Sequence, residues 1–446
     1  MQETVKSAGN VLPAAVLLMV AASPILAAEQ KPPFVQPPLQ MEAAQLVPTE
    51  LMAGEAYKVA PQATNDGYVN IYMLNTDWGE VTAVSDYRLR ARIQEVHALK
   101  ALDEMSRAGV FGDSLRNGVL APIEGLVNLV KSPIETTKGA VKGVGRWFGN
   151  IAKSVSSDDP HQEGALSAAT GWAGTKRAFA VELGVDPYTD WQPLSDALAS
   201  VGRAAFAGGI TARVAMGAAT RDTALQYPVM GLGLSKSMNQ VLKDNPPERI
   251  TEINRNEMAK LGLGTEVING FLRNHNYTPM EKLQFVDALK RMKGAKGLEA
   301  LVIQAGTAPD KGVAHYMQQR AMMMANFHAK VAPADLIPLA EVPVQKTADG
   351  RLVGVFPLDY VAWTADLDVI IRDMTGDAAV LSGVTSKEIW LEGSISPDAR
   401  EAAEALGWTV RERVGLLTGE PLQAVKAGSA IVVSPVARGA DAVVPR

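Results

Sequence analysis

The histidines of this chain are too scattered along the sequence to predict a metal site. None of the five (His97, His161, His275, His315 and His328) lies four residues from another, so the helical motif HExxH is absent. His315 and His328 would point in different directions on one helix. Because cysteine is also absent, we expect no metal and no cofactor. His275, in the loop RNHNYTP, is expected to be solvated or bonded within a turn.

Motifs of nucleophilic and nucleotide chemistry are also missing from the sequence. There is no GxSxG nucleophile elbow, no SxxK acylation motif and no P-loop. The run Gly143-Val144-Gly145 lacks the preceding strand and the spacing of a dinucleotide loop. No reaction can be assigned from motifs, and we lean toward a protein that is not an enzyme.

Two groups of residues in the C-terminal third are candidates for a site that carries no motif. An acidic group surrounds a hydrophobic strand or helix and is expected to face solvent, although a carboxylate pair for glycoside chemistry could lie within it. Its members are Asp366, Asp368, Asp373 and Asp377. In the stretch FPLDYVAWT, Asp359, Tyr360 and Trp363 are the first candidates for a hydrolytic or ligand-binding site. The alternative for these three is packing at a strand edge.

Residues 122 to 154 form three consecutive 11-residue repeats, PIEGLVNLVKS, PIETTKGAVKG and VGRWFGNIAKS. Eleven residues make about three helical turns, so this period keeps one apolar and one basic stripe in line. From Arg116 to Lys153 the local charge is 6 − 2 = +4, in a chain of net charge −5. Basic residues favour an anionic bilayer, and aromatic residues suit its interface. The predicted membrane or lipid contacts are Lys131, Lys138, Lys142, Arg146, Trp147, Phe148 and Lys153.

Other interpretations of the repeats stay open. Pro133 and five glycines within the segment lower its helix propensity, by about 1 kcal/mol for each glycine. The apolar stripe could pack on the protein's own helices, or it could fill a groove on a partner protein.

Composition limits the class of protein. A chain of 446 residues is long enough for two or three domains. It is 47% hydrophobic and only 6% aromatic, which favours helices over an all-β sandwich. The net charge of −5 argues against nucleic acid as a partner. The lack of cysteine is compatible with an oxidising compartment.

The N-terminus has the layout of a secretory signal peptide. Lys6 precedes the apolar run VLPAAVLLMVAA, and SPILAA ends it at small residues. We expect cleavage near Ala27 or Ala28. A retained membrane anchor is the alternative, but the apolar stretch is shorter than the roughly 20 residues of a membrane span.

The chain is predicted to have an α+β fold that is predominantly α-helical, with an N-terminal β-hairpin, a central helical region and a small C-terminal α/β module. The predicted divisions are a signal peptide (1–28), a Pro-rich linker (29–50), a β-hairpin plus helix (51–110), the amphipathic repeat segment (111–156), a helical domain (165–332), a small α/β domain (334–420) and a flexible tail (421–446).

Several local signals support these divisions. Two apolar runs within 67–85 predict a hairpin, after which Ser85 or Asp86 can cap a helix to about 108. The apolar stripe of this helix is predicted at Leu89, Ile93, Val96, Leu99, Leu102 and Met105. Thr278-Pro279-Met280-Glu281 is a plausible capping box. A helix over about 310–330 carries four methionines, for which core packing is favoured over a binding groove. Asp349-Gly350 predicts a second hairpin. The run DVIIRDM, EIWLEG, SPDAREAAEALG and WTVRERV is β–α–β-like, with Ser396 as a helix cap.

The runs PIEGLVNLVKSPIETTKGAVKGVGRWFG, ELGVDPYTDWQPL and AAFAGG resemble segments of an uncharacterised family of exported bacterial proteins. The resemblance covers about the first half of the mature chain. It implies export, but no activity, catalytic residues or cofactor. The 11-residue period is also similar in pattern to the lipid-binding repeats of apolipoproteins.

Together these features predict a non-enzymatic cell-envelope protein, exported to the periplasm of a Gram-negative bacterium. Its expected partner is an anionic membrane surface or an envelope protein, reached through residues 115 to 155. The alternative is a periplasmic hydrolase or ligand-binding protein, with a site between the helical body and the C-terminal α/β module.

Overall fold

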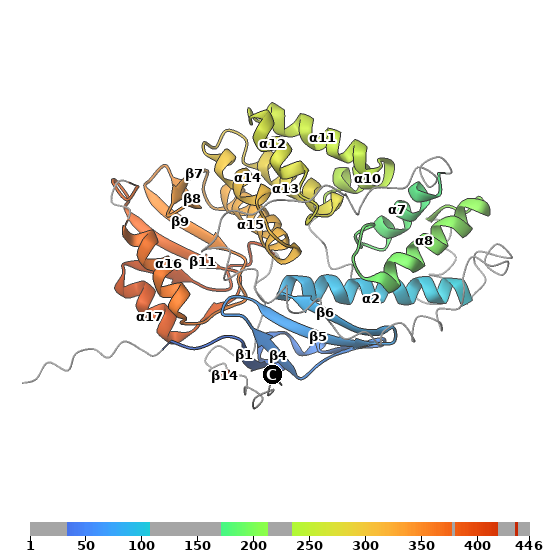
Figure 1. The fold of residues 1–446 in the computed structure, drawn as a ribbon, viewed down its shortest axis with the longest axis horizontal. Helices are drawn as coiled ribbons and strands as arrows, with labels where there is room; N and C mark the ends of the chain where they lie inside the picture. Colours follow the sequence, from blue (N-terminus) through green and yellow to red (C-terminus); the bar gives the residue numbers. More distant parts are fainter. Residues whose placement is uncertain (1–33, 108–170, 213–233, 377–379, 418–432, 436–446) are drawn as a thin grey trace, which may run out of the picture. The chain divides into compact units, whose positions relative to one another are not determined.

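The computed structural model describes residues 34–107, 171–212, 234–376, 380–417 and 433–435 (Figure 1). Within these residues the fold is mixed α/β, with 51% helix and 20% strand. The prediction of a predominantly helical fold was therefore wrong. The strands are distributed over three sheets, and most of them are too short for a periodic pattern to stand out in the sequence.

The first sheet is seven-stranded and extends well beyond the predicted hairpin. Its strands follow the order β14-β1-β4-β5-β3-β2, with β6 also paired to β5. They are β1 (Leu39–Glu42), β2 (Ala53–Gly54), β3 (Tyr57–Val59), β4 (Gln62–Asn65), β5 (Asn70–Thr76), β6 (Gly79–Val84) and β14 (Val433–Pro435). The β5–β6 pair confirms the hairpin, with Thr76 opposite Gly79.

Two parts of this sheet correct the predicted linker and tail. Leu39 and Met41 of β1 are each only 1% exposed, although the sequence places them in a Pro-rich linker. A short helix α1 (Ala43–Leu46) and a 3-10 turn η1 (Thr49–Leu51) follow. Strand β14, from the predicted flexible tail, pairs with β1. This pairing joins the two ends of the chain, so no local pattern could predict it.

Helix α2 (Asp86–Arg107) packs against β5 and β6, and its prediction is confirmed (Figure 1). All six residues of its predicted apolar stripe are buried: Leu89, Ile93, Val96, Leu99, Leu102 and Met105. Two further helices, α7 (Trp172–Glu182) and α8 (Gln192–Ala207), share the core of the first sheet and α2.

Six helices follow between residues 236 and 330. They are α10 (Lys236–Asp244), α11 (Pro247–Lys260), α12 (Thr265–Leu272), α13 (Pro279–Arg291), α14 (Leu298–Gly306) and α15 (Lys311–Lys330). The capping box at the start of α13 is confirmed, because Thr278 and Glu281 bond each other's backbone N–H. The four methionines of α15 (Met317, Met322, Met323 and Met324) are buried in the core. Core packing is thus their role in the fold.

The second sheet has the strand order β13-β11-β9-β8-β7. Its members are β7 (Ala334–Leu339), β8 (Val342–Thr347), β9 (Arg351–Phe356), β11 (Ser386–Leu391) and β13 (Trp408–Arg411). Helix α16 (Ala365–Gly376) connects β9 to β11, and α17 (Pro397–Ala405) connects β11 to β13. A two-stranded parallel pair, β10 (Tyr360–Val361) and β12 (Ser394–Ile395), completes this part.

The predicted features of this region are partly confirmed. Gly350 has φ +85° in the turn between β8 and β9, and Ser396 caps α17 by accepting from Ala399 N–H. The parallel β11–α17–β13 unit has the predicted pattern. The segment DVIIRDM, by contrast, lies in helix α16.

The buried cores do not follow the predicted domain boundaries. One core joins helices α11–α15 to the second sheet. The predicted domain boundary at 332–334 therefore runs through a single core. A second core joins the first sheet to α2, α7 and α8, and it includes Tyr360 from the C-terminal module. A third, smaller core lies among α10, α11 and α13. Among the described residues, no helix has both the length and the apolar character that a membrane crossing needs.

Candidate functional site

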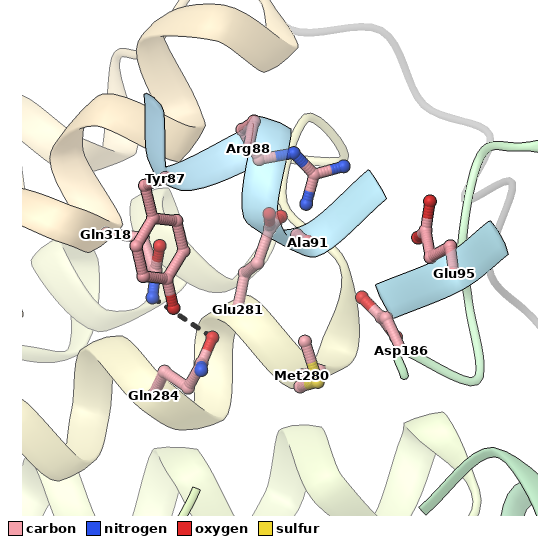
Figure 2. Close-up of a pocket in the computed structure, with 9 residues that line it drawn as sticks. All are labelled: Tyr87, Arg88, Ala91, Glu95, Asp186, Met280, Glu281, Gln284 and Gln318. Carbon is pink, nitrogen blue, oxygen red and sulfur yellow. Dashed lines mark hydrogen bonds between the residues drawn. The ribbon is translucent and has the colours of Figure 1, made fainter. Parts of the chain in front are cut away.

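A buried charged cavity lies where the first turns of α2 and α13 meet the loop that connects α7 to α8 (Figure 2). Its volume is about 20 Å³. A polar space of this size holds about one water molecule. Nine residues line it: Tyr87, Arg88, Ala91, Glu95, Asp186, Met280, Glu281, Gln284 and Gln318.

Glu281 is the central acidic residue of this cavity. Its Oε2 accepts a 2.9 Å hydrogen bond from the Thr278 backbone N–H, and its Oε1 contacts His315 Nδ1 of α15. Figure 2 shows the carboxylate directed toward Arg88. Burial alone would raise the pKa of Glu281, but His315 and Arg88 reverse that effect and lower it. Glu281 is therefore ionised at neutral pH despite being only 4% exposed.

Asp186 has the opposite character. Its Oδ1 accepts from Tyr188 N–H at 2.9 Å, and its Oδ2 accepts from Thr278 Oγ1 at 2.6 Å. Burial, followed by repulsion from Glu281, raises the pKa of Asp186 to about 7. Two neighbouring carboxyl groups thus differ in protonation near neutral pH, an arrangement that also occurs in acid–base catalysis.

A chain of ion pairs borders the cavity. Arg92 binds Glu95 Oε2 through Nη1 and Asp190 Oδ1 through Nη2, both at 2.5 Å. Glu95 Oε1 also accepts from Thr189 Oγ1 at 2.7 Å, and Lys311 lies 3.7 Å from Asp190. Burial opposes ionisation of Asp190, but Arg92 and Arg88 outweigh it and hold its pKa well below the usual range. These contacts fasten α2 to the α7–α8 loop.

A second buried polar network surrounds Asp359, one of the residues proposed from the sequence. Asp359 accepts from the backbone N–H groups of Asn70 (2.9 Å) and Asp86 (3.1 Å). Asp86 in turn accepts from Tyr72 Oη at 2.5 Å and from Asn70 Nδ2 at 3.0 Å. Burial, together with the charge of Asp86, raises the pKa of Asp359 well above its usual value, and burial raises that of Asp86.

The three aromatic and acidic candidates from the sequence have different surroundings. Asp359 belongs to the network just described. Tyr360 is 6% exposed and lies in β10, paired with Ser394. Trp363 is 1% exposed, and its ring lies 5.4 Å from that of Phe34. The structure therefore places the two aromatic rings in packing positions and the carboxylate in a polar one.

The predicted lipid-contacting residues lie outside the described part of the chain. These are Lys131, Lys138, Lys142, Arg146, Trp147, Phe148 and Lys153. The signal peptide and His161 also lie outside it. Among the described residues, no cluster of three or more histidine or acidic side chains has the arrangement of a metal site.

Sequence reasoning missed the charged cavity. Glu281 was recognised only as a helix cap, and His315 only as one of five scattered histidines. The sequence feature that could have indicated the cavity is the loop Asp186-Pro-Tyr-Thr-Asp190, because it places two acidic residues between two predicted helices. That loop lies within the segment ELGVDPYTDWQPL, on which the family resemblance partly rests.

Comparisons with known proteins identify no relative of this chain. No protein-family model, no curated protein and no solved structure matches it.

Proposed function

We propose that this chain is an exported, non-enzymatic cell-envelope protein of a Gram-negative bacterium, which contacts an anionic membrane surface through residues 115 to 155. The support from sequence is the signal-like N-terminus and the basic 11-residue repeats. An amphipathic segment of positive local charge gains both from apolar burial and from attraction to anionic lipid.

The structural observation that supports this proposal best is that the chain enters and leaves the repeat segment from two helices of the same core. Helix α2 ends at Arg107 and helix α7 begins at Trp172, and both helices pack against α8. Both ends of the intervening segment are thus attached to one core. The repeats that carry the predicted membrane contacts therefore lie, in sequence, between two helices of the same core.

The test is cosedimentation of the mature protein with phospholipid vesicles. We expect binding to vesicles that contain phosphatidylglycerol, little binding to pure phosphatidylcholine, and loss of binding as salt is raised. Absence of binding at low salt, or equal binding to both vesicle types, would contradict the proposal.

A second candidate function is hydrolysis or ligand binding at the charged cavity. The observation that favours it is the pairing of ionised Glu281 with Asp186, whose carboxyl pKa is about 7. A carboxylate beside a partly protonated carboxyl can act as base and acid in turn. The small volume of the cavity limits its present contents to about one water molecule.

A panel of chromogenic p-nitrophenyl esters, phosphates and glycosides tests this second candidate. Hydrolysis that is lost in Glu281→Gln, but kept in the exposed Glu252→Gln control, would support it. If the wild-type protein hydrolyses none of them, or if folded Glu281→Gln retains the activity, the cavity has only a structural role.

A further inference from the structure

An apolar cavity of about 50 Å³ lies against helix α16 in the C-terminal part of the fold. Leu367, Ile371 and Met374 of α16 contribute to its lining, as do Phe356 and Leu391. Phe356 and Leu391 are the last residues of β9 and β11 and lie opposite each other in the parallel register. The cavity is therefore at the carboxyl ends of two parallel strands, which is where open α/β sheets bind their ligands.

The lining of this cavity suits carbon rather than water. A water molecule needs two or more polar partners, whereas ten of the eleven lining residues are aliphatic side chains, methionine or phenylalanine. The remaining lining residue, Tyr68, adds an aromatic ring. A benzene molecule needs an apolar cavity of roughly 150 Å³, so by proportion this one encloses about two carbon atoms. The end of an aliphatic chain fits that size.

Acidic side chains flank one wall of the cavity. Ile370 lines it and is half-buried, and Asp366 and Asp373 lie four residues before and three residues after Ile370 on the same helix face. Both aspartates are exposed. Asp366 and Asp373 therefore flank Ile370, the half-buried residue of the lining. The basic residue of this helix, Arg372, is paired with Asp368 at 2.8 Å.

We propose that this cavity binds the aliphatic end of an alkylammonium ion, whose positive charge lies beside Asp366 and Asp373. The carbon chain would fill space that water leaves empty, and the ammonium group would complement the two carboxylates. An alkyl carboxylate of the same length would meet repulsion at the same position. The proposal depends on neither membrane contact nor chemistry at the charged cavity.

The test is calorimetric titration of the full-length mature protein with n-hexylammonium and with hexanoate. We expect the ammonium ion to bind about tenfold more tightly than the carboxylate, and Ile371→Phe, which fills the cavity, to weaken it by about tenfold. Val369→Phe, on the same helix at a residue that is 57% exposed, is the matched control and should bind as the wild type does.

A second variant removes the two carboxylate charges without changing the core, and so measures what these charges contribute to the binding of hexylammonium. In the double variant Asp366→Asn/Asp373→Asn, the two ions should bind within about twofold of each other. If circular dichroism shows that Ile371→Phe does not fold, the double variant alone tests the proposal. The proposal is overturned if neither ion binds, if both bind the wild type equally, or if folded Ile371→Phe binds hexylammonium normally.

Discussion

Asp359 Oδ1 accepts a 3.1 Å hydrogen bond from the backbone N–H of Asp86, which joins the segment after β9 to the first residue of α2. The same carboxyl group also accepts from Asn70 N–H of β5. Because Asp86 is itself a buried acid, this contact places two carboxyl groups in one desolvated environment. The network connects the first sheet to the C-terminal module through buried polar groups.

The buried aspartates of this network, together with Asp66 and with Asp186 of the charged cavity, are predicted to contribute a loss of stability as pH rises from about 4 to 7. Asp66 and Asp186 have pKa values raised to about 6 and about 7, and those of Asp86 and Asp359 are raised as well, by burial in every case. Above the usual aspartate value of 3.8, the unfolded chain has lost protons that the folded chain retains. Stability contributed by these protons is therefore full below that value and is lost as pH rises through the folded pKa values.

The variant Asp359→Asn tests the contribution of one such group. It should flatten the decline in the free energy of unfolding between pH 4 and 7 by up to about 1.4 kcal/mol per pH unit. Urea denaturation across this pH range gives the slope. The exposed Asp373→Asn serves as control and should keep the wild-type slope. Identical slopes in all three proteins would show that Asp359 takes up no proton on folding.

The contact between Glu281 and His315 predicts a large cost for removing the histidine. His315→Ala removes the side chain that contacts the buried Glu281 carboxylate, which should cost about 3 kcal/mol in urea denaturation at pH 7. Because the folded pKa of Glu281 is lowered, the wild type loses this contribution as pH falls below the usual 4.5. The two proteins should therefore converge in stability at low pH.

A surface cation gives the comparison for that prediction. Lys311 is on the same helix, 52% exposed and 3.7 Å from Asp190, so Lys311→Ala should cost less than about 1 kcal/mol. If both variants lose the same free energy of unfolding, the buried Glu281–His315 contact stabilises the fold no more than a solvent-exposed ion pair does.

The methionines of α15 are predicted to act by packing. Met323 is fully buried, so Met323→Ala should lower the free energy of unfolding by about 3 kcal/mol through lost contacts and a residual cavity. Ile303→Ala, at a side chain that is 50% exposed, should change it by less than about 1 kcal/mol. A binding-groove role, the alternative left open by the sequence, would instead leave stability nearly unchanged in Met323→Ala.

Helices were predictable from the sequence where an apolar stripe extended over several turns or where a complete capping motif was present. The stripe from Leu89 to Met105 located α2, and Thr278-Pro-Met-Glu281 located the start of α13. The first sheet was largely missed because its strands are short and partly polar, as in Gln62–Asn65. Its closing pair, Met41 with Val433, depends on a contact between the two ends of the chain.

The charged cavity was unpredictable for the same reason. Asp186 and Thr278 are 92 residues apart in sequence, and only the packing of the α7–α8 loop on α13 brings them within 2.6 Å. A helix cap and a loop aspartate carry no shared spacing from which a site could be inferred. Asp359 was selected from its aromatic neighbours, yet its polar partners come from β5 and α2.

Charge reversal within the repeat segment tests whether that segment contacts the membrane. The variant Lys131→Glu/Lys142→Glu/Lys153→Glu should abolish cosedimentation with phosphatidylglycerol vesicles, because three attractive charges become repulsive. A control with the same change of charge reverses three exposed lysines of the described body: Lys293, Lys296 and Lys330. We predict that this control sediments with the vesicles as the wild type does. If the repeat variant still binds, or if both variants lose binding equally, the repeats are not the membrane-contacting element.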